Sequence, residues 1–172
     1  MDKTLSKNRY WLLLLSMVLV FQVVGCAKKP DPNQRVGSDR FGYLTIPSDW
    51  EESTTGTSGI ETAAYYESSY KLIITVMVYT AVDLPMAQDN MKRYFTSEGI
   101  ELSEEVVTSL DSGTLNPVFK TRCYIPASNT YMALYLFNGP DGLARYIGVA
   151  ATGDDLVEVG IKIVESSYSF TE

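Results

Sequence analysis

The sequence predicts an α+β domain in which an antiparallel sheet of about six or seven strands carries two main helices. Short apolar segments of strand length recur between turns rich in Gly, Pro, Asn and Ser, which is typical of antiparallel sheets. Two longer segments place apolar residues at helical spacing. The chain is 45% hydrophobic and 20% charged, as expected of a globular domain rather than a disordered chain.

The amino-terminal segment has the pattern of a secretory signal. Lys3, Lys7 and Arg9 precede an uncharged apolar run over residues 11–24, which matches the basic and apolar regions of a signal peptide. A membrane-spanning helix needs about 20 apolar residues, and this run is shorter. An uncleaved membrane anchor is therefore the less favoured alternative.

The apolar run ends in Val23-Val24-Gly25-Cys26. This tetrapeptide resembles the lipobox of bacterial lipoproteins, in which a small residue precedes the modified cysteine. The resemblance implies that the Cys26 thiol takes a diacylglycerol and that the chain is cut between Gly25 and Cys26. We expect residues 1–25 to be the signal peptide, and the mature protein to be held at the cell membrane by this lipid with its domain outside the cytoplasm.

The segment after the cysteine is predicted to be a lipidated tether over residues 26–38, because it is mostly polar and contains two prolines and a glycine. Residues 39–172 then form one globular domain of ordinary size. The full chain has a net charge of −7, and loss of the leader makes it more acidic. Such a charge repels nucleic acid, so we expect no nucleic-acid partner.

The first half of the domain is predicted to contain three strands. A β-rich segment over residues 40–46 stops at Pro47. Residues 51–59 are interpreted as a loop, because they are rich in Ser, Thr and Gly. Strands follow over residues 62–66 and 71–79, and the second has apolar side chains on both faces, which predicts a central position in the sheet.

The middle of the chain is predicted to form the first helix, over residues 84–98. Asp83 is suited to cap its start and Gly99 to end it. Strands are expected near residues 105–110 and over residues 118–125, where the apolar residues alternate.

The last part of the chain is predicted to form a hairpin and a helix. Strands over residues 129–137 and 143–151 flank a turn rich in Asn, Gly and Pro. Residues 154–166 have helical spacing, although the β-branched content of residues 157–164 leaves a strand open there as an alternative. One face of the last strand is expected to leave room for this helix, because it carries small residues: Ala144, Gly148 and Ala150.

Two local signatures point to a known fold. Residues 41–50 read Phe-Gly-Tyr-Leu-Thr-Ile-Pro-Ser-Asp-Trp, and the closing helix runs into Ser169-Phe170. Together with the order of elements, they resemble the PsbP-like group, which includes the extrinsic PsbP protein of photosystem II and many bacterial lipoproteins. The resemblance implies an antiparallel sheet with helices packed on it and an accessory or binding role without catalysis. It assigns no functional residue.

The residue types exclude several kinds of chemistry. The chain contains no histidine, so His-dependent catalysis and His-ligated zinc are impossible. It has no phosphate-binding glycine motif, and we expect no cofactor. Cys123 is the only free thiol once Cys26 is acylated, and its place in an alternating strand predicts a buried, unreactive side chain. A group of carboxylates is interpreted as a solvated segment rather than a Ca²⁺ or amine site: Glu98, Glu101, Glu104 and Glu105.

Four tyrosines form the candidate binding surface, beside a Ser/Gly-rich segment: Tyr65, Tyr66, Tyr70 and Tyr79. Tyrosine offers contact area with one polar tip, although strand alternation sends Tyr65 and Tyr66 to opposite faces. We expect a non-catalytic binding or accessory module of the cell envelope whose partner is an envelope or extracellular protein or a glycan. The alternatives are a small-ligand carrier with a cavity between sheet and helices and, less favoured, a carboxylate-based hydrolase.

Overall fold

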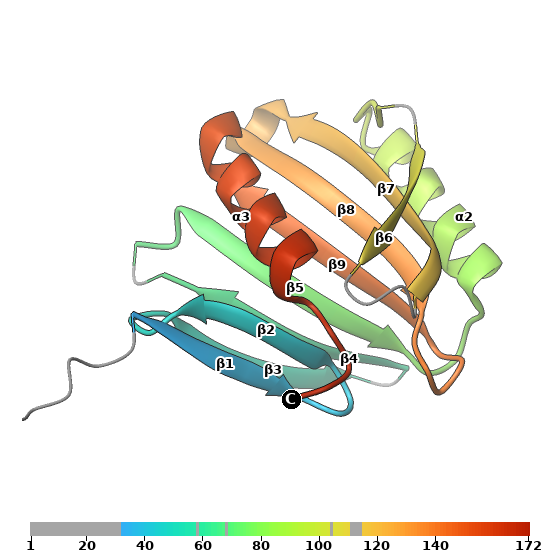
Figure 1. Ribbon diagram of the computed structural model, residues 1–172. Coiled ribbons are helices and arrows are strands. Elements are labelled where there is room, and N and C mark those ends of the chain that lie inside the picture. The colour runs from blue at the N-terminus through green and yellow to red at the C-terminus, as the bar shows by residue number, and fades with distance from the viewer. Residues whose placement is uncertain (1–31, 58, 68, 104, 111–114) are drawn as a thin grey trace, which may run out of the picture. The chain divides into compact units, whose positions relative to one another are not determined.

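The computed structural model describes residues 32–172 except for 58, 68, 104 and 111–114. Within these ranges the protein has a seven-stranded antiparallel sheet of strand order β3-β4-β5-β9-β8-β7-β6 and a separate two-stranded sheet, β1-β2 (Figure 1). Two α-helices, α2 and α3, pack on the large sheet. The predicted α+β fold class is therefore confirmed.

The described elements follow one another along the chain with these bounds: β1 (Asn33–Ser38), β2 (Gly42–Pro47), β3 (Glu51–Thr57), β4 (Ile60–Tyr66), β5 (Leu72–Tyr79), α2 (Leu84–Ser97), β6 (Val106–Leu110), β7 (Leu115–Ile125), a 3₁₀ turn (Pro126–Ser128), β8 (Thr130–Asn138), β9 (Ala144–Ala151) and α3 (Asp154–Ser167). Neither helix in the described part of the chain is long and apolar enough to span a membrane.

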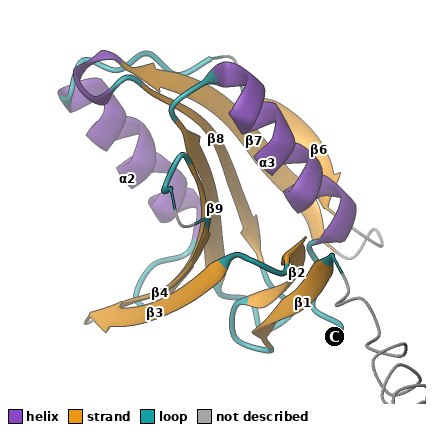
Figure 2. Ribbon diagram, turned by 90° about the vertical axis from the view of Figure 1, so that its left-hand side faces the viewer, coloured by secondary structure: helices purple, strands orange, loops and turns teal. Residues whose placement is uncertain are grey.

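The large sheet is covered differently on its two faces (Figure 2). Helix α3 and the β1–β2 hairpin lie on one face, where they close a core with β4, β5, β8 and β9. Helix α2 lies on the other face and packs mainly on β8 and β9. The two faces thus carry two separate apolar cores, one under α3 and the hairpin and one under α2.

The prediction of a tether up to residue 38 is wrong for its second half. Asn33–Ser38 forms β1, which pairs with β2 along its whole length, so the folded unit begins at Pro32 rather than at residue 39. The hydrogen bonds of β1 come from its partner strand, and its side chains are mostly polar because one face of the hairpin meets water. Residues 26–31 lie outside the described part of the chain.

The prediction of a loop over residues 51–59 is also wrong. Glu51–Thr57 forms β3, which pairs with β4 over seven positions and is the edge strand of the large sheet. An edge strand buries few side chains, so it lacks the apolar alternation by which strands are found in a sequence. Residues 51–56 are exposed, and the charges of Glu51 and Glu52 disfavour further pairing at this edge.

The other elements are confirmed with small shifts of their ends. β5 has neighbours on both sides, β4 and β9, as its two apolar faces predicted. Asp83 caps α2, because its carboxylate accepts a hydrogen bond from the Met86 amide at 2.9 Å. The segment with β-branched residues forms α3, so the helical spacing was the better guide.

The prediction that small residues of the last strand receive the final helix is wrong. Ala144 and Tyr146 belong to the core under α2, whereas α3 packs on the opposite face, with Val149. The close approach of α3 depends instead on its own Gly160. A Cβ atom built there would collide with the Val149 side chain and would lie 3.0 Å from the Leu72 side chain.

Gly160→Ala is therefore expected to lower the free energy of unfolding by about 1–3 kcal/mol, the usual cost of overpacking. The sign of this change is informative, because at an exposed position in a helix interior the same substitution would raise the stability by about 1 kcal/mol. Urea denaturation monitored by circular dichroism measures the effect. Adding Val149→Ala should recover part of the loss, and a single Gly160→Ala variant more stable than the parent would contradict this account of the packing.

Candidate functional site

The four predicted tyrosines do not form one surface. Tyr65 is 0% exposed and lies in the core under α3 and the hairpin, so the prediction of a binding surface is wrong for this residue. Tyr66 and Tyr70 stack on each other with ring centroids 4.8 Å apart. Tyr79 lies at the other end of β5, half-buried beside α2. The structure thus brings together Tyr66 and Tyr70 and separates the other two from them.

Tyr79 lines a hollow whose walls are mostly apolar. It runs between α2 and the strands β5 and β9, is open to solvent, and has a volume of about 240 Å³. We call it the α2 groove. Its walls are formed by Met77, Tyr79, Asn90, Met91, Tyr94, Phe95 and Tyr146.

Strand register and helix spacing together position these side chains. Met77 on β5 pairs with Tyr146 on β9, and directly paired residues of antiparallel strands point to the same face. Met91 and Phe95 are buried on the inner stripe of α2, four residues apart. Tyr94 is 61% exposed and packs against the Phe95 ring in a T-shaped arrangement, so it forms the outer wall of the α2 groove.

A glycine shapes the floor of the α2 groove. A Cβ atom on Gly148 would lie only 2.8 Å from the Tyr146 ring and hydroxyl, so the tyrosine side chain lies along the strand across Gly148 instead of standing upright. Burial raises the pKa of Tyr79 and of Tyr146, so both hydroxyls stay neutral at physiological pH. The groove therefore presents uncharged aromatic and thioether surface with phenol groups that are able to donate hydrogen bonds.

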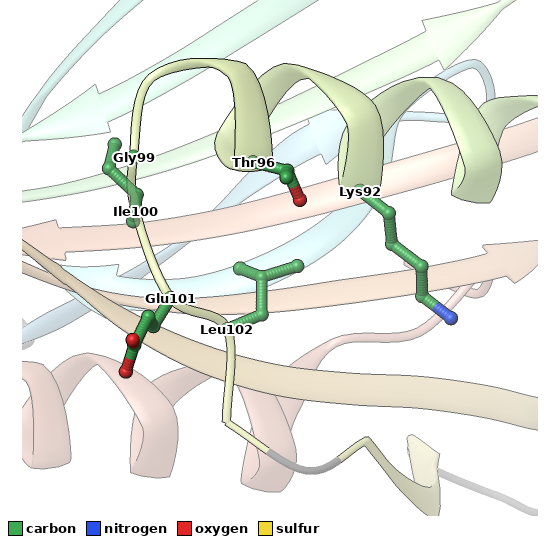
Figure 3. Close-up of a pocket in the computed structure, with 6 residues that line it drawn as sticks. All are labelled: Lys92, Thr96, Gly99, Ile100, Glu101 and Leu102. Carbon is green, nitrogen blue, oxygen red and sulfur yellow. The ribbon is translucent and has the colours of Figure 1, made fainter.

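A second, more polar pocket lies at the end of α2 and has a volume of about 610 Å³ (Figure 3). Its lining comes from the last turns of the helix and the segment that follows: Lys92, Thr96, Gly99, Ile100, Glu101 and Leu102. Figure 3 shows the Lys92 ammonium and the Glu101 carboxylate pointing away from each other, with Leu102 between them. This arrangement mixes both charges with apolar surface and does not converge on one kind of ligand.

The predicted acidic cluster is dispersed. Glu98 and Glu101 are exposed, and Glu104 lies outside the described residues. Glu105 is held against α2, where its carboxylate accepts hydrogen bonds from the Gln88 amide at 2.7 Å and lies 3.4 Å from the Lys92 ammonium. Among the described residues, no group of three or more Cys, Asp and Glu side chains is placed to hold a metal ion.

Cys123, a free thiol of β7, lies where the alternation of this segment predicted it. Cys123 is 9% exposed and packs in the core under α2. Burial raises the pKa of its thiol to about 11, so the reactive thiolate is scarce at neutral pH. The prediction of a buried cysteine is confirmed.

A buried arginine that the sequence reading missed organises the β8–β9 turn. Arg145 is 1% exposed, and its guanidinium donates to both carboxylate oxygens of Asp141, at 2.6 and 2.9 Å. It also donates to the Arg40 carbonyl and lies 4.7 Å from the centre of the Phe170 ring. Gly139 leaves the room that the guanidinium occupies. An arginine within the otherwise uncharged segment of β9 was the only signal in the sequence.

Two carboxyl groups, those of Asp141 and Glu61, have lowered pKa values and are held in their charged form. A hydrogen bond from Arg145 lowers the pKa of Asp141 to about 2, and one from Arg40 lowers the pKa of Glu61. A carboxylate-based hydrolase needs a carboxylic acid with a raised pKa as proton donor. Asp141 and Glu61 have the opposite shift and serve as partners of arginines.

Comparison with known proteins adds no further assignment, because no family model and no curated protein sequence matches the chain. The resemblance of residues 41–50 to the opening strand of PsbP-like proteins therefore stays a prediction. In this fold Phe41 and Trp50 pack against the core under α3 and the hairpin, so both have a structural role here.

Proposed function

We propose that the protein is a membrane-anchored extracytoplasmic lipoprotein whose domain binds an envelope or extracellular protein without catalysis. The anchor is Cys26, by the lipobox that ends the apolar leader. The binding role is supported by one observation, the α2 groove, which is an open hollow lined by aromatic and methionine side chains.

The size of the α2 groove favours a protein partner over a small ligand. Sites for small molecules have volumes of about 300–1,000 Å³ and enclose most of the ligand. The α2 groove is smaller, at about 240 Å³, and open. It suits one or two apolar side chains of a partner, which insert as the anchors of many protein interfaces do.

The lining of the α2 groove agrees with this proposal. Met77 and Met91 lie on opposite walls, one on β5 and one on α2. Methionine is flexible and polarizable, and surfaces that accept varied apolar side chains use it often. The neighbouring tyrosines add area with hydroxyl groups at the rim, which suits a surface that alternates between water and a partner.

A small-ligand carrier is the second candidate, and the pocket at the end of α2 is the observation that favours it. Its volume of about 610 Å³ lies within the range of ligand sites. Mass spectrometry of small molecules released from the purified native protein tests this candidate, since a carrier retains a stoichiometric ligand.

Site-specific photocrosslinking in intact cells tests the protein partner. A benzophenone amino acid is placed at Tyr94, on the rim of the α2 groove, and in a control at Met86, which is 52% exposed on the same helix but outside the groove. The proposal predicts one defined adduct from position 94, none from position 86, and loss of the adduct when Met77→Glu places a charge in the groove.

Equal adducts from both positions, or no adduct while a small molecule co-purifies, would contradict binding through the α2 groove. Circular dichroism of the Met77→Glu variant serves as the control for folding. Tyr94 and Met86 are both exposed, so neither replacement disturbs a core.

A further inference from the structure

The start of β1 shortens the link between the domain and the proposed lipid. This inference rests on the proposed anchor at Cys26. Asn33, the first residue of β1, follows Cys26 by only seven residues. A fully extended chain spans at most about 3.5 Å per residue, so the start of β1 lies within about 25 Å of the acylated cysteine whatever path the chain takes.

The residues around the start of β1 form one end of the domain, which we call the tether end: Pro32, residues 47–50, Tyr66, Tyr70 and Lys71. Asn33 pairs with Pro47, and the Ser48 amide donates to the Pro32 carbonyl at 3.1 Å. The chain then enters β3, whose first residue, Glu51, pairs with Tyr66. The start of β1 and the start of β5 both lie at the left-hand end of the molecule in Figure 1, and Figure 2, which looks onto that end, shows them apart from each other across it.

An aromatic pair projects from the tether end. Tyr70 is 59% exposed and stacks on Tyr66 at 4.8 Å, with 21° between the ring planes. Tyr70 has a φ of 53°, which is a left-handed backbone conformation that residues other than glycine rarely adopt. Residues held in such conformations cluster at functional sites. The exposed Tyr70 ring, backed by the half-buried Tyr66 ring, therefore marks this turn as a contact surface to be explained.

The bilayer surface matches the chemistry of this end. Tyrosine and tryptophan rings settle at the membrane–water interface, where the ring contacts lipid and the hydroxyl meets water. Lys71 is exposed beside the pair, but Asp49, Glu51 and Glu67 lie close by. The charges at this end therefore do not favour anionic headgroups, and the aromatic rings supply the contact.

From the short link and the aromatic pair together, we propose that the tether end rests on the bilayer, with the Tyr70 ring among zwitterionic headgroups. The opposite end of the β1–β2 hairpin, at Asp39, then points away from the membrane. The α2 groove stays accessible, because it lies between α2 and the far part of β5, whereas Tyr70 precedes the start of that strand.

Fluorescence quenching from the membrane tests this orientation. The full protein is isolated from membranes with its native lipid and placed in phosphatidylcholine vesicles that contain a nitroxide-headgroup lipid. A fluorophore is attached in separate samples to Ser69→Cys, next to Tyr70, and to Asp39→Cys; both positions are exposed. Cys123 is buried with a raised pKa, so it reacts slowly with the label.

The proposal predicts that quenching at position 69 is about threefold or more stronger than quenching at position 39. Tyrosine rings settle at the level of the headgroups, and quenching by the nitroxide falls steeply with distance from that level. Replacing both tyrosines, Tyr66→Ser with Tyr70→Ser, should reduce this difference. Tyr94→Ser, which removes an equally exposed tyrosine outside the tether end, should not.

Equal quenching at both positions, or stronger quenching at position 39, would overturn the proposed orientation. The mass of the same sample separates this outcome from a failure of the anchor. An acylated Cys26 with equal quenching contradicts the orientation alone, whereas a protein that carries no lipid and does not sediment with vesicles contradicts both proposals.

Discussion

Asp141→Ala is expected to lower the free energy of unfolding by about 3–5 kcal/mol, the cost of leaving a buried charge without its partner. Arg145 is 1% exposed, so removal of Asp141 leaves its guanidinium buried without the carboxylate that it is paired with. The other groups that touch its guanidinium, the Arg40 and Leu143 carbonyls and the Phe170 ring, carry no negative charge. Urea denaturation measures the loss.

Two comparisons make this prediction specific. Asp89→Ala removes an exposed aspartate on α2 and should change stability by less than about 0.5 kcal/mol. Arg145→Met replaces the buried charge by an apolar side chain of similar length and should cost less than Asp141→Ala, since the Asp141 carboxylate then reaches water. If Asp141→Ala lowers the free energy of unfolding no more than Asp89→Ala does, the fold does not depend on the ion pair between Asp141 and the buried Arg145.

The Asp141–Arg145 ion pair also makes the stability of the protein depend on pH in acid. Because the folded-state pKa of Asp141 is lowered from 3.8 to about 2, its contribution to stability is complete above about pH 4 and is lost as the pH falls toward 2. This part of the acid sensitivity should be missing from Asp141→Ala. Thermal unfolding between pH 2 and pH 5 compares the two proteins.

Phe95→Ala is expected to lower the free energy of unfolding by about 3–5 kcal/mol, as for other buried phenylalanines. Phe95 is 6% exposed, and with Leu84, Ala87 and Met91 it forms the stripe that holds α2 on the sheet. The matched control is the next residue, Tyr94, which is 61% exposed. Tyr94→Ala should cost less than about 1 kcal/mol.

Both variants alter the α2 groove, so together they separate stability from binding. Tyr94→Ala should reduce binding of the protein partner while the fold stays intact, whereas Phe95→Ala should impair both. Similar losses of stability for the two variants in urea would mean that α2 is not held by its inner stripe.

The sequence was sufficient to predict those helices and strands whose own residues show an apolar pattern. β5 and β9 carry long apolar runs, and α2 has a capping aspartate and helical spacing. β1 and β3 could not be found in this way, because their strand structure depends on pairing with β2 and β4. Pairing between segments leaves no periodic trace in a polar strand.

The candidate site, like the fold, could be predicted only where the signal lies in a residue's own segment. Tyr79 was identified as a possible binding residue, but Tyr146 and Met91 were not, because strand register and the docking of α2 bring these three residues together. The predicted binding surface contains Tyr65, although this residue is buried in the structure. Sequence alternation showed that Tyr65 and Tyr66 face opposite ways, but it could not say which face the hairpin covers.

The mass of the amino-terminal peptide of the native protein tests the central claim most directly. A membrane-anchored lipoprotein predicts a peptide that begins at Cys26 and carries a diacylglycerol on its thiol. A peptide that begins at Met1, or an unmodified Cys26, would contradict the anchor and with it the role proposed for this protein at the membrane.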